Sequence, residues 1–246
     1  MSKKVVLAFS GGLDTSYCAK YLSETLAYEV HAVTINTGGF DKEDEVSLKE
    51  KAEKLGVASY RFVDASEKYY NDCVRYLIFG NVLKNNTYPL SVSAERTIQA
   101  QTIAEVALEI GADAIAHGST GAGNDQVRFD LMFQVMCPKI EIITPIRDLS
   151  LSREDEIQFL KNHNYEMDFD KAKYSINKGL WGTSVGGKET LTSRHHLPEE
   201  AFPSQIERTE PSQLEIEFKN GELISVNGKT YSHPVLAIQK IEELAS

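Results

Sequence analysis

The protein has 246 residues, of which 41% are hydrophobic and 25% are charged. That is long enough for one sizeable α/β core, or for one domain and part of another. Its 26 Lys and Arg residues are outnumbered by 36 Asp and Glu residues, which gives a formal charge of −10. This acidic balance argues against broad binding to nucleic acid or to anionic membranes, although a local pocket can still hold an anionic ligand.

The cysteines and the N-terminal residues bear on the cellular compartment. Cys18, Cys73 and Cys137 are far apart and form no CxxC pair, so neither a disulfide framework nor a zinc site is expected. The apolar stretch before Ser10 is only five residues long, which is too short for a signal peptide or a membrane span. We therefore expect a cytoplasmic protein with no membrane partner, no nucleic-acid partner and no dedicated metal site.

The first two thirds of the chain alternate between strand and helix patterns. Val5–Phe9 is a short apolar run that stops at a glycine pair, as a buried parallel strand does before a tight turn. The further expected strands are 29–35, 58–63, 112–117 and 140–144, and the expected helices are 14–26, 41–55, 66–79, 93–110 and 152–163. This alternation predicts an α/β fold with a doubly wound parallel sheet.

The character of the sequence changes after about residue 168. The stretch Tyr174–Pro203 is rich in Gly, Ser and Thr and shows little periodicity. Beyond it, 214–218 and 222–226 flank Lys-Asn-Gly, which predicts a hairpin, and 234–244 has a helical pattern. We therefore divide the chain into a sheet domain, 1–168, and a loop-rich, partial α+β domain, 169–246.

The sharpest motif directly follows the first expected strand and opens the first helix. Gly11 and Gly12 allow a tight turn that brings backbone N–H groups close to an anion. The helix N-terminus adds partial positive charge, and nearby hydroxyl groups can donate to phosphate oxygens. Asp14 suits such a site if Mg²⁺ bridges it to phosphate, or if it only caps the helix. The motif lacks the GxxxxGK[ST] and GxGxxG spacings of other nucleotide-binding loops.

The segment SGGLDTS at residues 10–16 resembles the SGGxD[ST]S signature of the PP-loop ATP pyrophosphatases. The resemblance implies an adenine nucleotide alpha hydrolase-like fold and a loop that holds the pyrophosphate of ATP while the α-phosphate is attacked. The ATP-binding residues that it implies are Ala8, Phe9, Ser10, Gly11, Gly12, Leu13, Asp14, Thr15 and Ser16. The same superfamily includes ligases and tRNA-modifying enzymes, and this loop does not separate them.

A second polar, glycine-rich loop follows the fourth expected strand at residues 117–125. Parallel strands present their carboxyl ends at one edge of the sheet, so we expect this loop to open beside the first. Within nine residues it offers Thr120, Asn124, Asp125 and Arg128, a set that suits an amino-acid zwitterion. In this interpretation Asp125 takes the ammonium, Thr120 and Asn124 take a carboxylate, and Arg128 takes a second carboxylate or a phosphate.

The stretch HGSTGAGNDQVRF at residues 117–129 resembles the HG-x-TG-x-GNDQ-x-RF segment of the argininosuccinate synthase family. The resemblance covers the whole chain, and it implies that Thr120, Asn124 and Asp125 bind aspartate. It also adds Ile35 and Gly118 to the ATP-binding set. The citrulline-binding residues that it implies are Tyr88, Ser93, Asn124, Arg128, Ser175 and Ser184. From the residues alone, Ser93 is equally an N-cap, and Ser175 and Ser184 are ordinary loop serines.

The family's reaction would join citrulline to aspartate with MgATP, through citrullyl-AMP, and would assign Asp14, Asp125 and Arg128 to catalysis. The family's usual chain is longer and forms a homotetramer, so the sequence predicts a piece that lacks the C-terminal part. Two alternatives stay open: a nucleotide-binding fragment without turnover, or a tRNA-thiolating PP-loop enzyme. The second would need a catalytic cysteine, but Cys18 lies inside the first expected helix.

Overall fold

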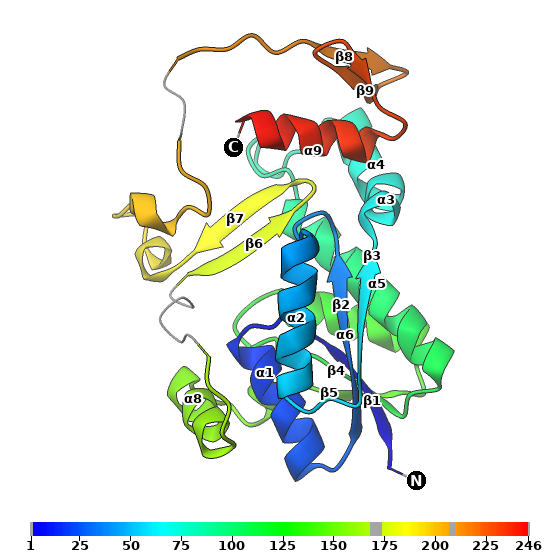
Figure 1. The fold of residues 1–246 in the computed structure, drawn as a ribbon, viewed down its shortest axis with the longest axis vertical. Helices are drawn as coiled ribbons and strands as arrows, with labels where there is room; N and C mark the ends of the chain where they lie inside the picture. The colour runs from blue at the N-terminus through cyan, green and yellow to red at the C-terminus, as the bar shows by residue number, and fades with distance from the viewer. Residues whose placement is uncertain (1, 168–173, 207–209, 246) are drawn as a thin grey trace. The chain divides into compact units, whose positions relative to one another are not determined.

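A computed structural model describes residues 2–167, 174–206 and 210–245 of the chain (Figure 1). The described chain forms two compact units. The first comprises Met1–Asn36, Phe40–Ala65 and Glu95–Ala172, and the second comprises Thr37–Gly39, Ser66–Ala94 and Lys173–Ser246. The domain boundary predicted after residue 168 falls outside the described residues.

The first unit is built on a five-stranded parallel sheet of order β3-β2-β1-β4-β5. The strands are β1 (Lys4–Ala8), β2 (Glu29–Asn36), β3 (Ser59–Asp64), β4 (Ala114–Ala116) and β5 (Glu141–Ile143). The central strand β1 is apolar on both sides, with Val5, Val6 and Leu7 fully buried, as expected of a parallel strand covered by helices on both faces. The strand order reverses between β1 and β4, so a crevice at their carboxyl ends is expected to bind ligands. The predicted doubly wound sheet is confirmed.

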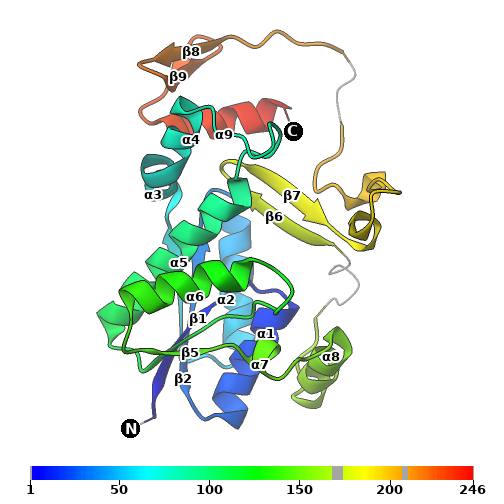
Figure 2. The same ribbon diagram turned by 180° about the vertical axis from the view of Figure 1, so that it is seen from behind.

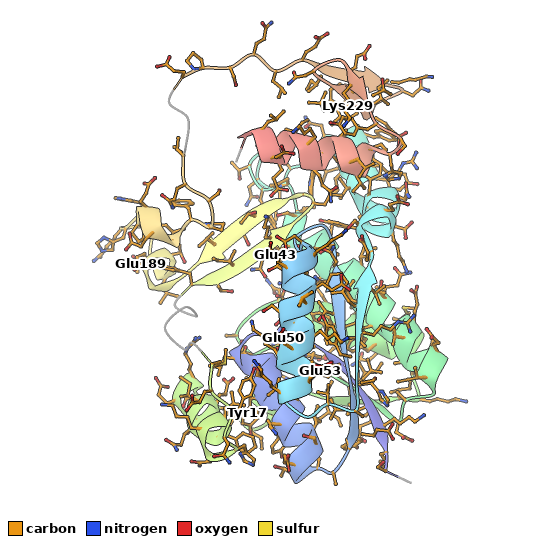
Figure 3. The ribbon with its side chains drawn as sticks, in the orientation of Figure 1. Tyr17, Glu43, Glu50, Glu53, Glu189 and Lys229 are labelled. Carbon is orange, nitrogen blue, oxygen red and sulfur yellow. The ribbon has the colours of Figure 1, made fainter. Side chains whose placement is uncertain are left out.

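One face of the sheet is covered by α1 (Leu13–Lys20) and α2 (Lys42–Lys54) (Figure 1). A π-helical turn, η1 (Tyr21–Thr25), continues α1. Asp41 and Asp44 form a capping box at the start of α2, and three exposed glutamates, Glu43, Glu50 and Glu53, lie along this helix (Figure 3). This cap and the buried Leu48 and Ala52 fix α2 on the sheet.

Helix α8 (Arg153–Asn162) packs against α1, with the rings of Tyr17 and Phe159 4.7 Å apart. Its N-cap, Ser152, forms the predicted capping box with Asp155. Tyr17 lies where α1 meets α8 (Figure 3). A short helix, α7 (Pro145–Asp148), follows β5.

The opposite face is covered by α5 (Ser91–Ile110) and α6 (Asp125–Met136) (Figure 2). Phe133 is fully buried, and the thiol of Cys137, just after α6, donates to the Ala104 carbonyl of α5 over 3.7 Å. The sequence analysis did not predict α6. Its apolar residues surround the helix, because Phe129 and Phe133 are buried whereas Val127 and Val135 are exposed, so no single apolar stripe marks it.

The second unit combines helices with antiparallel strands. Its helical segment runs through α3 (Ser66–Tyr69), η2 (Tyr70–Val74) and α4 (Arg75–Phe79). The hairpins are formed by β6 (Ser175–Gly179) and β7 (Gly182–Gly186), and by β8 (Ile216–Lys219) and β9 (Glu222–Val226), which also pairs with β10 (Lys229–Thr230). Helix α9 (Pro234–Ala245) packs on β9 through Leu223, Val226 and Ala237. The short helices η4 (Lys188–Leu191) and η5 (Glu199–Ala201) complete the described elements.

Most predicted elements are confirmed within one to three residues at each end, and two expectations need correction. Helix α5 begins at Ser91, so Ser93 lies inside its first turn, and the N-cap interpretation of Ser93 is wrong. The stretch 174–186, expected to be irregular, is the β6–β7 hairpin. Its Ser, Thr, Asn and Gly residues lack the apolar alternation that marks a strand, so backbone pairing defines it instead.

Candidate active site

The loop between β1 and α1 leaves the first amides of α1 available to a ligand. Gly12 is the N-cap residue, and no side chain caps the helix, so the first-turn N–H groups have no partner from a cap. Gly11 has a φ of +70°, and a Cβ at this position would lie 2.5 Å from Leu48 Cδ2 of α2. A side chain here would strain the backbone and require Leu48 to move, so glycine is favoured at this position. The loop therefore has the local structure of an anion site at a helix N-terminus.

Side chains around this loop divide into buried anchors and exposed hydroxyls. Phe9 and Leu13 are 3% and 4% exposed, so only their backbone can meet a ligand. The hydroxyl groups of Ser10 and Thr15 lie 3.2 Å apart, and that of Thr15 donates to the Gly12 carbonyl over 3.3 Å. These contacts close the loop on itself and keep two hydroxyls at its exposed surface.

The loop after β4 lies directly against the first one. β1 and β4 are parallel neighbours, with Leu7 opposite Ala116. A Cβ on Gly118 would lie 3.1 Å from Asp14 Cβ and 3.3 Å from the Thr15 nitrogen. The two loops therefore open at the same edge of the sheet, as the sequence analysis predicted, and Gly118 permits their close approach.

The start of α6 carries a charged cluster. One carboxylate oxygen of Asp125 accepts from Arg128 Nη1 over 2.7 Å, and the other accepts from Arg96 Nε of α5 over 3.1 Å. Thr120 and Asn124 are exposed beside this cluster. The four residues predicted to hold an amino-acid zwitterion thus stand within one loop and one helical turn.

Arg96 is a functional candidate that the sequence analysis missed. It also donates to Glu95 over 3.2 Å and to Gln99 over 2.9 Å, so its guanidinium is held in a fixed place. A charged pair within the mostly apolar helix 91–110 was the available signal. Arg96 thus joins the carboxylates of Glu95 and Asp125, and Arg128 pairs with the same Asp125, so Asp125 is held in place by two arginines.

A pair of carboxyl groups lies at the start of α1. Glu156 of α8 is 4% exposed and hydrogen bonds to Asp14. Burial, followed by the charge of Asp14, raises the pKa of Glu156 to about 8, while Arg153 opposes the shift. Burial also raises the pKa of Asp14, and the hydrogen bond from Glu156 opposes that shift. At neutral pH Glu156 therefore holds the proton and donates it to the Asp14 carboxylate.

The sequence analysis missed Glu156, although its position carried a signal. It stands four residues before the buried Leu160, on the same face of α8, where an apolar residue is expected. A second missed residue is Lys51 of α2, whose Nζ lies 3.8 Å from the position that a Gly11 Cβ would occupy. It brings a cation to the edge of the anion loop.

The predicted citrulline residues fall into both units. In the second unit, the Tyr88 hydroxyl accepts from the Val92 amide over 3.1 Å. Ser175 lies on β6. Ser184 lies on β7, where it is paired with Asn177 of β6. The Trp181 indole donates to the Pro89 carbonyl over 3.1 Å, so the turn of this hairpin joins the segment that carries Tyr88.

The remaining predicted positions are at the first unit's sheet and loops. Ile35, in β2, is 4% exposed.

Across residues 2–167, 174–206 and 210–245, no group of three or more His, Cys, Asp and Glu side chains could hold a metal ion. Among the helices of these residues, none combines the length and the apolar character that a membrane crossing requires.

Comparison with known proteins agrees with this geometry. Residues 4–166 match the family model described as the arginosuccinate synthase N-terminal HUP domain. The chain is 39% identical to the argininosuccinate synthase of Methanocaldococcus jannaschii over 100% of its own length and 62% of that protein. It is 37% identical to the one of Pyrobaculum aerophilum, over 94% of the chain and 59% of that protein. A third, from Saccharolobus solfataricus, is 38% identical over 92% and 58%.

The matched residues include the glycine loops and the carboxyl pair of the candidate site. The chain spans about three fifths of the length of the curated relatives that it matches. The family match also includes the strands that carry these loops. The chain therefore belongs to the argininosuccinate synthase family.

Proposed function

We propose that this protein takes part in the ATP-dependent ligation of citrulline and aspartate to argininosuccinate. One observation carries the proposal: Gly118 lies against Asp14 and Thr15, so the anion loop and the zwitterion loop meet at one sheet edge. A triphosphate on the first loop and an amino acid on the second would then be neighbours. The names of the relatives point to the same reaction.

The first step would be attack of the citrulline ureido oxygen on the α-phosphorus of ATP, which forms citrullyl-AMP and releases pyrophosphate. The second would be displacement of AMP by the aspartate amino group. The AMP ester converts a poor leaving group into a good one. The protein's part in this scheme is positioning and charge stabilisation, with no covalent intermediate on the chain.

The roles follow from the charges at each loop. The first-turn amides of α1, which no N-cap side chain occupies, and the hydroxyls of Ser10 and Thr15 would hold the pyrophosphate. Mg²⁺ would arrive with ATP, ligated mainly by phosphate oxygens, and Asp14 would lie near it as a carboxylate. Asp125 would orient the aspartate amine, while Thr120 and Asn124 would take a carboxylate.

Asn124 and Arg128 are proposed as citrulline-binding residues, and Tyr88, Ser93, Ser175 and Ser184 are proposed for the same role. The support for this set is the match to the family's motif. We also propose a cytoplasmic enzyme, in keeping with three free cysteines, and a homotetramer of the full-length protein.

The structure gives no support to thiolation through the buried cysteines. Cys18 is fully buried and Cys137 is 3% exposed. Burial raises the pKa of both thiols. A protonated, inaccessible thiol is a poor nucleophile.

The test is release of pyrophosphate and AMP from MgATP, with citrulline and aspartate added separately and together. We expect pyrophosphate only when citrulline is present, and argininosuccinate only when aspartate is present as well. Asp14→Asn should reduce pyrophosphate release by at least about tenfold. The control is Glu50→Gln, which changes an exposed carboxylate on α2. Release of ADP and phosphate, or full activity of Asp14→Asn, would refute the proposal.

A further inference from the structure

A chain of polar contacts begins at His117, directly after β4. The imidazole is 1% exposed and stacks on Phe129, with ring centroids 5.4 Å apart. Its Nδ1 accepts from the Ser119 amide over 3.2 Å. Because an amide can only donate, Nδ1 must carry a lone pair, and the ring proton lies on Nε2. That nitrogen donates to Asp130 Oδ1 over 2.9 Å.

Asp130 of α6 connects His117 to a second helix. Its other oxygen, Oδ2, accepts from Arg147 Nη1 of α7 over 2.6 Å. The hydrogen bond from His117, and then the one from Arg147, lower the pKa of the Asp130 carboxyl. The carboxylate in turn raises the pKa of Arg147. The pair is therefore fully charged at neutral pH, and its hydrogen bonds are charge-assisted.

Arg147 also bonds to Gln126, the side chain that holds the glycine-rich loop. Its Nη1 donates to Gln126 Oε1 over 3.0 Å. This bond fixes which end of the Gln126 amide faces the loop, so that Nε2 donates to the Gly121 carbonyl over 2.7 Å and to the Gly123 carbonyl over 3.3 Å. Arg147 Cγ lies 3.7 Å from the position of a Gly121 Cβ, so the arginine stem supports the loop as well.

These contacts link the start of the loop, at Ser119, to its tip, at Gly121 and Gly123. We call the linked side chains of His117, Asp130, Arg147 and Gln126 the circuit. A loop with three glycines in seven residues has many accessible backbone states and would lose more entropy than most when a ligand orders it. The circuit removes much of that freedom before any ligand arrives. None of the four side chains of the circuit, those of His117, Asp130, Arg147 and Gln126, is in the substrate-binding set deduced above.

We propose that Asp130, Arg147 and Gln126 are positioning residues that preorganise loop 118–124 for its amino-acid substrate. The inference rests on the proposed function for the identity of that substrate, aspartate. It requires that loosening the circuit weakens aspartate binding while nucleotide binding at the first loop is retained.

The test is Gln126→Glu, which keeps an oxygen toward Arg147 and replaces the amide that ties the loop. Glutamate is also favourable in the first turn of α6, so the helix should persist. The matched control is Gln158→Glu, the same change at an exposed α8 residue that bonds to Asn162. Gln126→Ala serves as the second variant should Gln126→Glu fail to fold.

Two readouts are measured: amide hydrogen exchange in loop 118–124, and calorimetric titration with aspartate and separately with MgATP. We expect Gln126→Glu to speed loop exchange and to weaken aspartate binding, each by about tenfold. MgATP binding, to which this loop contributes only Gly118, should weaken much less, and the control should be unchanged. Unchanged loop exchange in a folded variant would overturn the inference. If loop exchange is faster in Gln126→Glu but the wild-type protein does not bind aspartate, the circuit is upheld and the proposed function is refuted instead.

Discussion

At the scale of single residues, the site depends on groups whose properties come from burial. Gly11 was predicted from its motif. The structure gives the reason in its positive φ and in the 2.5 Å between Leu48 Cδ2 and the position that a Cβ on Gly11 would occupy. Glu156 was not predicted, because its effect comes from Asp14, a residue 142 positions away (156 − 14) that the fold brings next to it. Local patterns can reveal the glycine but not this carboxyl pair.

Glu156 should make stability depend on pH. Its pKa of about 8 in the folded protein exceeds its ordinary value of 4.5, so the folded state holds a proton that the unfolded chain releases above that value. The stabilisation is fully present below about pH 4.5 and is lost as the pH rises through about 8. Glu156→Gln, which cannot ionise, should become more stable relative to wild type as the pH rises.

The measurement is the free energy of unfolding in urea at pH 5, 7 and 9. We expect the difference between Glu156→Gln and wild type to shift by on the order of 1 kcal/mol or more over this range. Asp14, Tyr17, Cys18, Arg153 and Asp155 are charged or titratable groups around Glu156, and their identities are the same in both proteins. Glu154→Gln, at an exposed position of α8, is the control. If the free energies of unfolding of Glu156→Gln and wild type change in parallel with pH, the raised pKa assigned to Glu156 is wrong.

At the scale of elements, most strands and helices followed the patterns, whereas α6 and the β6–β7 hairpin did not. The hairpin's place in the second unit is fixed by the segment 37–39. The Leu180 amide donates to the Thr37 carbonyl over 2.9 Å. A Cβ on Gly38 would lie 2.8 Å from Leu180 Cβ, and one on Gly39 would lie 1.9 Å from the Lys178 carbonyl oxygen. A contact between backbone atoms does not depend on which side chains are hydrophobic, so hydrophobic periodicity could not predict it.

Gly39→Ala should therefore separate the hairpin from the 37–39 segment. A backbone oxygen cannot move aside as a side chain can, so we expect a loss of about 2 kcal/mol or more in the free energy of unfolding. Faster hydrogen exchange at the Leu180 amide should accompany it. Gly186→Ala, whose Cβ would lie 4.0 Å from the Ser175 carbonyl oxygen, is the control. Equal effects of the two substitutions would show that the contact is unimportant.

At the scale of the whole molecule, the two units do not follow a single cut in the sequence. Residues 66–94 lie between two parts of the first unit but belong to the second. Arg75 pairs with Glu222 over 3.4 Å, the Tyr70 ring packs edge-on to His233 at 5.5 Å, and Trp181 donates to Pro89. A division after residue 168 would place the two partners of each of these contacts on opposite sides.

A fragment of residues 1–167 should thus retain the parallel sheet but leave 66–94 without its partners. We expect faster hydrogen exchange across 66–94 in the fragment than in the whole chain, together with binding of a hydrophobic dye. Exchange in β1 and β4 should change less, because their neighbours are all retained. Identical exchange of 66–94 in both proteins would mean that this segment is stable without residues 168–246.

The sequence by itself determined the fold class and both glycine loops of the candidate site, because strand hydrophobicity and glycine-rich turns are local properties. It also supplied the motifs that resemble the family. Only the tertiary structure brought Glu156 to Asp14, Arg96 to Asp125, Lys51 to Gly11, and Gln126 to Arg147. The physical reason is that burial and charge pairing depend on side chains from distant segments, and their meeting is fixed by how helices pack on the sheet rather than by spacing along the chain.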